Sequence, residues 1–414
     1  MNAPAIKGWC PGALRPMESG DGLIVRLKLT GGIVPLGLAT RIADWSHRFG
    51  NGEIDLTARA NLQLRGVTEE SLPGLQQAIA DAGLLDENPD GEAVRNVIAS
   101  PLAGLDQDAV LDIRPWVAAL EARLAGDPKL YALPAKFCFA VDDGGQLGLG
   151  GLSADVRFEA APGPAFLVGL DGAPDETLGP CRPEELADVA ARLAGVFLAR
   201  RNDGRRMRDL VARIGAAEIA REAGLPLSFV RMTIEESRRE TSRAFLAAGL
   251  PFGRISADNL WALAEHAARS GAIELRLTPW RAILIPAPSQ EAARQLARSL
   301  SPDAFILDPA DSRRRVAACV GLPACLRAAT AVREDASRLA SLIETDSFLH
   351  VSGCAKGCAY PRSAPVTLVG NNGLYDLVRD GAPSDAPVLS GLTLDEAAGY
   401  LRQMAAKQSQ GTTV

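Results

Sequence analysis

The order of strand and helix patterns in this chain is repeated once, and this repeat constrains the fold more than any other feature. Each copy reads as strand, helix, two strands and helix, with a Gly-x-Ile-acidic-Leu stretch shortly before Thr57 or Thr278. The elements are expected at residues 23–30, 35–48, 53–57, 62–66 and from Ser71, and again at 252–255, from Ser256, 273–278, 282–285 and from Ser289. One copy alone would leave a sheet face poorly covered, so the two are expected to pair into one domain.

The stretches between and after the two copies predict two further α/β domains. Strand patterns occur at 136–141, 348–351 and 366–369, and helical patterns occur at 183–201 and 205–222. The sequence therefore predicts an α+β fold, in which two half-domains pair and two α/β domains accompany them. The expected boundaries are 1–87, 88–228, 229–304 and 305–414.

Four cysteines near the C-terminus predict a metal centre. They form two pairs, Cys319 with Cys325 and Cys354 with Cys358, and glycines flank the second pair. An iron–sulfur cluster needs four thiolates and tolerates wide, irregular spacing, whereas structural zinc usually takes cysteines two to four residues apart. We favour a 4Fe–4S cluster, with zinc as the weaker alternative. Buried core cysteines, which are common singly, are a third interpretation, and two glycine-flanked pairs within about forty residues argue against it.

Composition and charge fit an intracellular enzyme. The 414 residues are 47% hydrophobic and 23% charged, which is ordinary for a globular protein. The start lacks the apolar stretch of a secretory signal, and no run approaches the roughly 20 apolar residues that span a bilayer. With seven cysteines, a reducing cytoplasm and no membrane association are expected. The net charge of −6 argues against nucleic-acid binding, so an anionic ligand would need locally gathered cations.

Several stretches together resemble the sulfite and nitrite reductase superfamily, and within it the precorrin-3B synthase family. The cysteine pairs match the superfamily's cluster motif in spacing and order. Further similar stretches are Thr57 to Gln63, Val94 to Val97 with Ser100-Pro101, and Leu133 to Phe137; those closer to the precorrin-3B synthases are Gly8 to Met17, Ser19 to Gly22, Pro251 to Arg254, Leu277 to Arg281 and Ser352 to Cys358. The resemblance covers most of the chain. It implies ferredoxin-like half-domains and sulfite-reductase-like α/β domains.

The resemblance also implies which residues form the site. Arg59, Arg95 and Lys136 match the superfamily's active-site cations and are expected to be catalytic. The residues expected to bind the carboxylates of a substrate are Arg59, Arg65, Arg95, Asn96, Lys136 and Arg281. The reductases place a second lysine where this chain has Cys138, which weakens the case for reduction of a small oxyanion.

The activity implied by the family is oxygenation of a tetrapyrrole. Precorrin-3A would be hydroxylated at C20 with O2, and the ring A acetate would close a γ-lactone, in aerobic cobalamin biosynthesis. A 4Fe–4S cluster, a second non-haem iron and a reductant (NADH, or a reductase or ferredoxin) are the expected cofactors and partners. A two-histidine iron site would need two of His47, His266 and His350, which lie in separate predicted elements.

Two other functions stay open at the level of sequence. A sirohaem-dependent sulfite or nitrite reductase is the first alternative, with Cys358 at the position that also ligates the sirohaem iron in those enzymes. A simple electron carrier is the second. The arginine and lysine motifs far from the cysteines argue against the carrier, because electron transfer alone requires no such groups.

Overall fold

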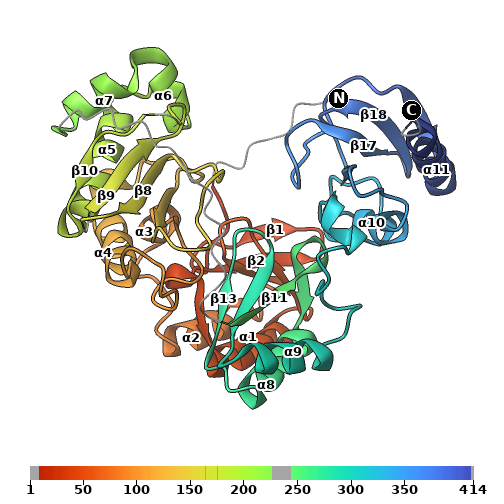
Figure 1. Cartoon of the computed structure of the whole chain (residues 1–414), viewed down its shortest axis with the longest axis horizontal. Coiled ribbons are helices and arrows are strands. Elements are labelled where there is room, and N and C mark those ends of the chain that lie inside the picture. Colours follow the sequence, from red (N-terminus) through yellow and green to blue (C-terminus); the bar gives the residue numbers. More distant parts are fainter. Residues whose placement is uncertain (1–8, 164, 175, 226–243, 412–414) are drawn as a thin grey trace.

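The structure is a computed structural model that describes residues 9–163, 165–174, 176–225 and 244–411. A central domain lies below two α/β lobes that stand on either side of it (Figure 1). The first lobe runs from β6 to α7 and the second from β15 to α11. The α+β class with paired half-domains and two α/β domains is confirmed, whereas the domain boundaries stay predictions.

The central domain contains two antiparallel sheets, and each sheet takes its last strand from the other repeat. The first sheet has the order β1 (Met17–Ser19), β2 (Gly22–Leu27), β5 (Leu62–Val67), β4 (Glu53–Leu56) and β12 (Arg254–Ser256). The second has the order β11 (Phe245–Gly249), β14 (Ala282–Pro286), β13 (Glu274–Leu277) and β3 (Ile33–Pro35). Because β12 pairs with β4 and β3 pairs with β13, the two repeats are joined by a reciprocal strand exchange.

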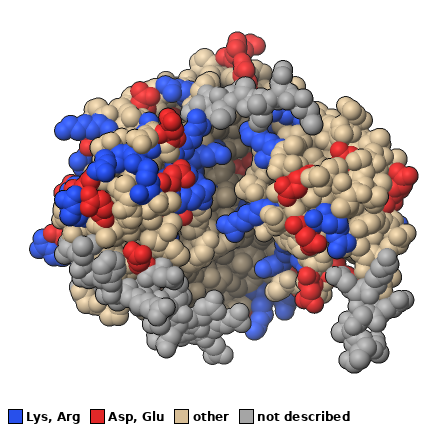
Figure 2. All heavy atoms as spheres, turned by 90° about the horizontal axis from the view of Figure 1, so that it is seen from above, with Lys and Arg blue, Asp and Glu red and all other residues tan. Residues whose placement is uncertain are grey.

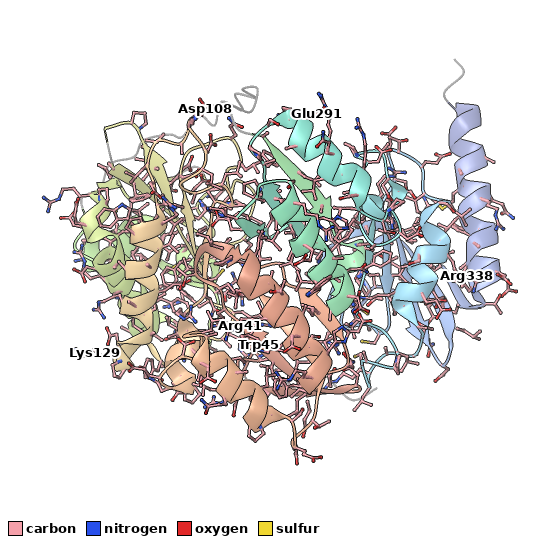
Figure 3. The ribbon with its side chains drawn as sticks, turned by 90° about the horizontal axis from the view of Figure 1, so that it is seen from below. Arg41, Trp45, Asp108, Lys129, Glu291 and Arg338 are labelled. Atoms are coloured by element: carbon pink, nitrogen blue, oxygen red, sulfur yellow. The ribbon has the colours of Figure 1, made fainter. Side chains whose placement is uncertain are left out.

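Four helices cover the lower side of these sheets. They are α1 (Leu36–Phe49), α2 (Leu72–Asp81), α8 (Ala257–Arg269) and α9 (Gln290–Ser299). Helices α1 and α8 pack side by side, and one apolar core includes residues of both repeats. Ser256 and Ser289 cap α8 and α9 through their side chains, as the sequence predicts. Arg41 stacks on Trp45 of α1 on this underside (Figure 3).

The two lobes share one sheet topology, so the duplication extends beyond the half-domains. The first lobe contains β6 (Val97–Ala99), β7 (Phe139–Asp142), β8 (Val156–Ala161), β9 (Ala165–Leu170) and β10 (Pro180–Cys181). The second contains β15 (Val316–Ala318), β16 (Leu349–Ser352), β17 (Ala364–Asn371), β18 (Leu374–Gly381) and β19 (Leu389–Leu392). In each lobe the first three strands pair in parallel, the fourth strand pairs antiparallel with the third, and the fifth pairs antiparallel with the fourth.

Helices cover one face of each lobe's sheet. The helices of the first lobe are α4 (Arg114–Ala125), α5 (Leu186–Arg200), α6 (Met207–Ile214) and α7 (Ala216–Glu222), preceded by α3 (Pro89–Val94). Those of the second are α10 (Val332–Ala340) and α11 (Leu394–Gly411). The single helix predicted over 205–222 is in fact α6 and α7, because Gly215 adopts a φ of +81° that ends the first.

Seen from above, the space-filling surface is hollowed between the two lobes (Figure 2). Lys and Arg side chains gather along both sides of this hollow. Among the described residues, no helix combines the length and the apolar character needed to cross a bilayer.

Candidate functional site

The four cysteines of the C-terminal motif lie at one edge of the second lobe's sheet. Cys319 and Cys325 follow β15, and Cys354 and Cys358 follow its parallel neighbour β16. Carboxyl ends of adjacent parallel strands meet at the same edge, which brings the two pairs together. All four are free thiols. Burial raises the pKa of Cys319 and of Cys358, and the neighbouring cysteines raise both further, because nearby negative charges oppose ionisation.

Backbone groups also lie close to the cysteine sulfurs. A four-iron cluster takes its thiolates on separate irons and leaves room for such groups. In the described ranges, no group of three or more His, Cys, Asp or Glu side chains is arranged to hold a single metal ion. The Gly353 N–H donates to the sulfur of Cys319 at 3.2 Å, and Gly357 has a φ of +62° that favours glycine between Cys354 and Cys358.

The loop that carries Cys325 is fastened to the central domain through one carbonyl oxygen. The Ala324 carbonyl accepts hydrogen bonds from the Gly20 N–H at 3.1 Å, the Ser19 hydroxyl at 2.5 Å and the Arg65 guanidinium at 3.1 Å. A side chain at Gly20 would collide with the neighbouring Pro323 carbonyl. The hairpin of β1 and β2 therefore fixes the loop beside one of the four thiols.

Arg65 belongs to this internal support. Its side chain is 2% exposed and pairs with Asp21 at 2.7 Å and Asp55 at 3.2 Å. The expected role of Arg65 as a substrate ligand does not fit this position. Asp55 in turn accepts from Arg254 and Arg333 at 2.9 and 2.8 Å. Burial would raise the pKa of Asp55, but the charges of Arg333, Arg254 and Arg65 outweigh it, and its pKa lies well below the usual value.

Arg95 and Asn96 also lie inside the protein, where the first lobe meets the central domain. Arg95 is 11% exposed and forms ion pairs with Asp86 at 2.8 Å and Glu121 at 2.9 Å. Asn96 is buried, donates to the Ala93 carbonyl at 2.8 Å and accepts from Lys28 at 3.1 Å. Neither position fits the expected contact with substrate. Both residues hold the first lobe in place.

Three other residues predicted to bind substrate, Arg59, Lys136 and Arg281, have charged groups without an ion-pair partner in the described ranges. The Arg59 guanidinium donates to the Lys136 carbonyl at 2.6 Å, where the central domain meets the first lobe. Arg281, on the side of the second lobe, packs over Gly253, and burial lowers the pKa of its guanidinium. In the described part of the chain, none of Arg59, Lys136 and Arg281 has a carboxylate within 4.0 Å. These side chains can therefore offer charge to an anionic ligand.

Arg26 joins this set and was missed by the sequence analysis. It donates to Gln63 at 2.7 Å, has no described carboxylate within 4.0 Å, and lies close enough to Arg59 for their charges to interact. Burial and the charge of Arg59 lower the pKa of Arg26. The sequence does hold a signal for it, because alternation along β2 puts Arg26 on the face opposite to the core residues Val25 and Leu27.

The three histidines do not gather into a metal site. His47 on α1 pairs with Asp258 at 2.9 Å, His266 lies on α8, and His350 is fully buried in β16 of the second lobe. Burial and the charge of Arg281 lower the pKa of His350 to about 4, so its ring is neutral at pH 7. Its ring meets Tyr360 edge-on at 5.9 Å, and neither ring nitrogen has a described hydrogen-bond partner. His350 is thus a buried neutral group near the cysteines.

Comparison with known proteins agrees with this architecture. Residues 15–82 and 237–302 match the nitrite/sulfite reductase ferredoxin-like half domain, and residues 90–230 match the nitrite and sulphite reductase 4Fe-4S domain. The solved structure of the Mycobacterium tuberculosis NirA protein superimposes with a TM-score of 0.73 at 21% identity, covering 93% of this chain and 80% of that one. This likeness supports the fold.

Two relatives show the family more closely. A ferredoxin–nitrite reductase of Synechococcus elongatus is 26% identical over 86% of this chain and 77% of its own length. A precorrin-3B synthase of a Sinorhizobium species is 31% identical over 92% of this chain and 84% of its own length. The match to the 4Fe-4S domain supports an iron–sulfur cluster, but it covers residues 90–230, so the assignment of the cluster to the four cysteines at 319–358 stays a prediction. The chain therefore belongs to the precorrin-3B synthase family, a group of iron–sulfur oxidoreductases related to the nitrite and sulfite reductases.

Proposed function

We propose that this protein converts precorrin-3A to precorrin-3B as a monooxygenase. One atom of O2 enters the substrate at C20, the other leaves as water, and two electrons and two protons come from a reductant; the ring A acetate then closes a γ-lactone. The observation that carries the proposal is a set of cations without carboxylate partners in the described ranges, namely Arg26, Arg59, Lys136 and Arg281. A substrate rich in carboxylates matches such a set.

The residues of the chain would hold and orient this substrate. The planar guanidinium groups of Arg26, Arg59 and Arg281 can each form paired hydrogen bonds with a carboxylate, and Lys136 adds a point charge. Cys319, Cys325, Cys354 and Cys358 would hold the cluster, which when bound supplies electrons singly. NADH, or a reductase or ferredoxin, is the proposed reductant.

A second, non-haem iron does not fit the side chains that the structure describes. Neither the three histidines nor any other group of His, Cys, Asp or Glu in the described ranges is arranged for it. We therefore assign no residues to that iron. Cytoplasmic location, with no nucleic-acid or membrane partner, stays part of the proposal.

Sirohaem-dependent reduction of sulfite or nitrite is the second candidate function. The similarity to a nitrite reductase favours it, as does the exposed thiol of Cys358, which stands at the superfamily's haem-ligating position. Against it, Cys138 replaces the second active-site lysine, and burial raises the pKa of this thiol, so it provides neither positive charge nor a ready proton.

The test of the proposed function is turnover of precorrin-3A by the cluster-loaded protein. Incubation with a chemical or enzymatic reductant and isotopically labelled O2 should give precorrin-3B carrying one labelled oxygen, detected by mass spectrometry. Parallel assays with sulfite and nitrite, and an absorption spectrum for sirohaem, test the alternative. Reduction of either oxyanion without conversion of precorrin-3A would replace the monooxygenase by the reductase.

Replacing Arg59 with glutamine should weaken binding of precorrin-3A about tenfold or more and leave the visible spectrum of the cluster unchanged. The reason is that a charge-assisted hydrogen bond contributes about 1.5–3 kcal/mol, and 1.4 kcal/mol corresponds to a factor of ten. The measurement is an anaerobic binding titration of the holoprotein. Arg41→Gln is the matched control, because Arg41 lies on the underside against Trp45 (Figure 3). Equal affinity of the Arg59 and Arg41 variants would remove Arg59 from the site.

A further inference from the structure

A pocket of about 370 Å³ is lined by residues of β7, β8 and β9 in the first lobe and by one residue of the second lobe. Along β8, Val156 and Ala160 belong to the helix-covered core, whereas Arg157 and Glu159 line the pocket. The glycine-containing loop 148–153 forms another wall. Arg362, in the segment after Cys358, comes from the other lobe. Side chains of both lobes therefore line this pocket.

Two of the three arginines in this pocket are available to a ligand. Arg208 faces Asp171 at 3.8 Å. For Arg157 and Arg362, by contrast, no carboxylate lies within 4.0 Å and no hydrogen bond is formed by the side chain within the described ranges. Arg157 is half-buried on a strand, so its position is set by the sheet. Two guanidinium groups from separate lobes therefore meet at one small cavity without internal partners.

The acidic side chains of the same pocket do not neutralise these two arginines. Asp142 accepts hydrogen bonds from the Gly144 and Leu149 N–H groups and the Ser100 hydroxyl, so both its oxygens are engaged. Asp171 faces Arg208, and Glu176 is exposed.

Glu159, next to Arg157, differs from these acids. Burial, and then the charge of Asp142, raise the pKa of Glu159, while the charge of Arg157 lowers it. A carboxylate entering the pocket would therefore meet two guanidinium groups that have no carboxylate within 4.0 Å in the described ranges.

We propose that this pocket binds a single carboxylate-bearing side chain at the edge of the tetrapyrrole, held by Arg157 from the first lobe and Arg362 from the second. The inference rests on the proposed function and adds a binding subsite to it. A pocket of this volume suits an acetate or propionate arm with the adjoining ring edge, while the rest of the macrocycle occupies the hollow between the lobes.

The location gives this contact a second effect. Arg362 lies four residues after Cys358, so a carboxylate bound by Arg362 also fixes the segment that carries two of the cluster cysteines. The other guanidinium belongs to a sheet of the opposite lobe. One bound carboxylate therefore ties the cysteine-bearing lobe to the first lobe across the hollow.

The test compares Arg157→Gln, Arg362→Gln and the control Arg41→Gln in the cluster-loaded protein. Precorrin-3A is titrated anaerobically at low and at moderate salt, and thermal unfolding and the cluster spectrum are recorded for each variant. We expect each pocket variant to raise the Kd about tenfold and to show a weaker dependence of the Kd on salt, since one ionic contact is lost. The control should match the wild type.

The outcomes separate this inference from the function on which it rests. If the wild type binds and converts precorrin-3A and both pocket variants bind it with unchanged affinity and salt dependence, the subsite is wrong and the proposed function stands. If the wild type itself does not bind precorrin-3A, both are overturned. Weaker binding together with unchanged salt dependence and a lower unfolding temperature would mean structural damage, and that result also counts against the subsite.

Discussion

Cys325→Ser should yield a folded protein that has lost its iron–sulfur cluster and, with it, all turnover. The serine hydroxyl is a poor substitute for a thiolate, and the loop around Cys325 is already fixed by three hydrogen bonds to the Ala324 carbonyl, which limits its adjustment to a new ligand. Iron and acid-labile sulfide analysis, with the visible absorbance of anaerobically reconstituted protein, measures the loss. Activity should fall to background, an effect of several orders of magnitude.

Cys181→Ala provides the matched control for this loss. Cys181 lies on β10 in the core of the first lobe, whereas the four C-terminal cysteines lie in the second lobe; burial raises the pKa of Cys181 to about 12. The variant should keep full iron and sulfide content. Retention of the complete cluster by Cys325→Ser would show that this residue is not a ligand and would disconnect the cysteine motif from the proposed electron supply.

Asp55→Asn should lower the free energy of unfolding by about 3–5 kcal/mol, the usual effect of removing one partner from a buried ion-pair network. Three arginines, Arg65, Arg254 and Arg333, share this carboxylate, and Arg65 also holds the Ala324 carbonyl. The variant should therefore release iron to a chelator faster than the wild type. Urea unfolding of the holoprotein and the rate of chelation at pH 7 are the two measurements.

The pH dependence of the same network has a definite sign. The pKa of Asp55 is depressed in the folded state, so its contribution is present above the unfolded value of about 3.9 and is lost as the pH falls toward the folded value. The wild type should lose stability below about pH 4 more steeply than Asp55→Asn. The control, Asp44→Asn, breaks an exposed pair with Arg48 and should cost less than about 1 kcal/mol. Identical acid unfolding of the wild type and Asp55→Asn would contradict the role of the network.

The repeat and the cysteine motif could be predicted because each depends on the spacing of residues that are close together in the sequence. Alternation and apolar spacing identify β2, α1 and α8 directly, and paired cysteines near glycine are recognisable without knowing their neighbours. The exchange of β3 and β12 could not be predicted in this way. Each of these strands has three residues, which is too short for a periodic signal, and their pairing is decided by contacts between segments far apart in sequence.

The roles of the arginines were the least predictable part of the site. Arg65 and Arg95 resemble ligand residues in their local motifs, yet both form ion pairs inside the protein. Arg65 pairs with Asp21 and Asp55. Arg95 pairs with Asp86 and Glu121. Whether a cation is free or paired depends on such distant partners, which motif spacing does not reveal. Arg59 and Arg26, by contrast, have no carboxylate within 4.0 Å in the described ranges.

The reciprocal exchange of β3 and β12 also limits how the gene can be divided. A protein fragment that contained only one repeat would lack the edge strand that the other repeat supplies. The exposed sheet edge would carry unpaired backbone N–H and C=O groups, which favour aggregation through pairing with strands of other molecules. Each repeat therefore supplies the strand that completes the other repeat's sheet. Splitting the chain between the repeats should give pieces that regain order only when they are expressed together.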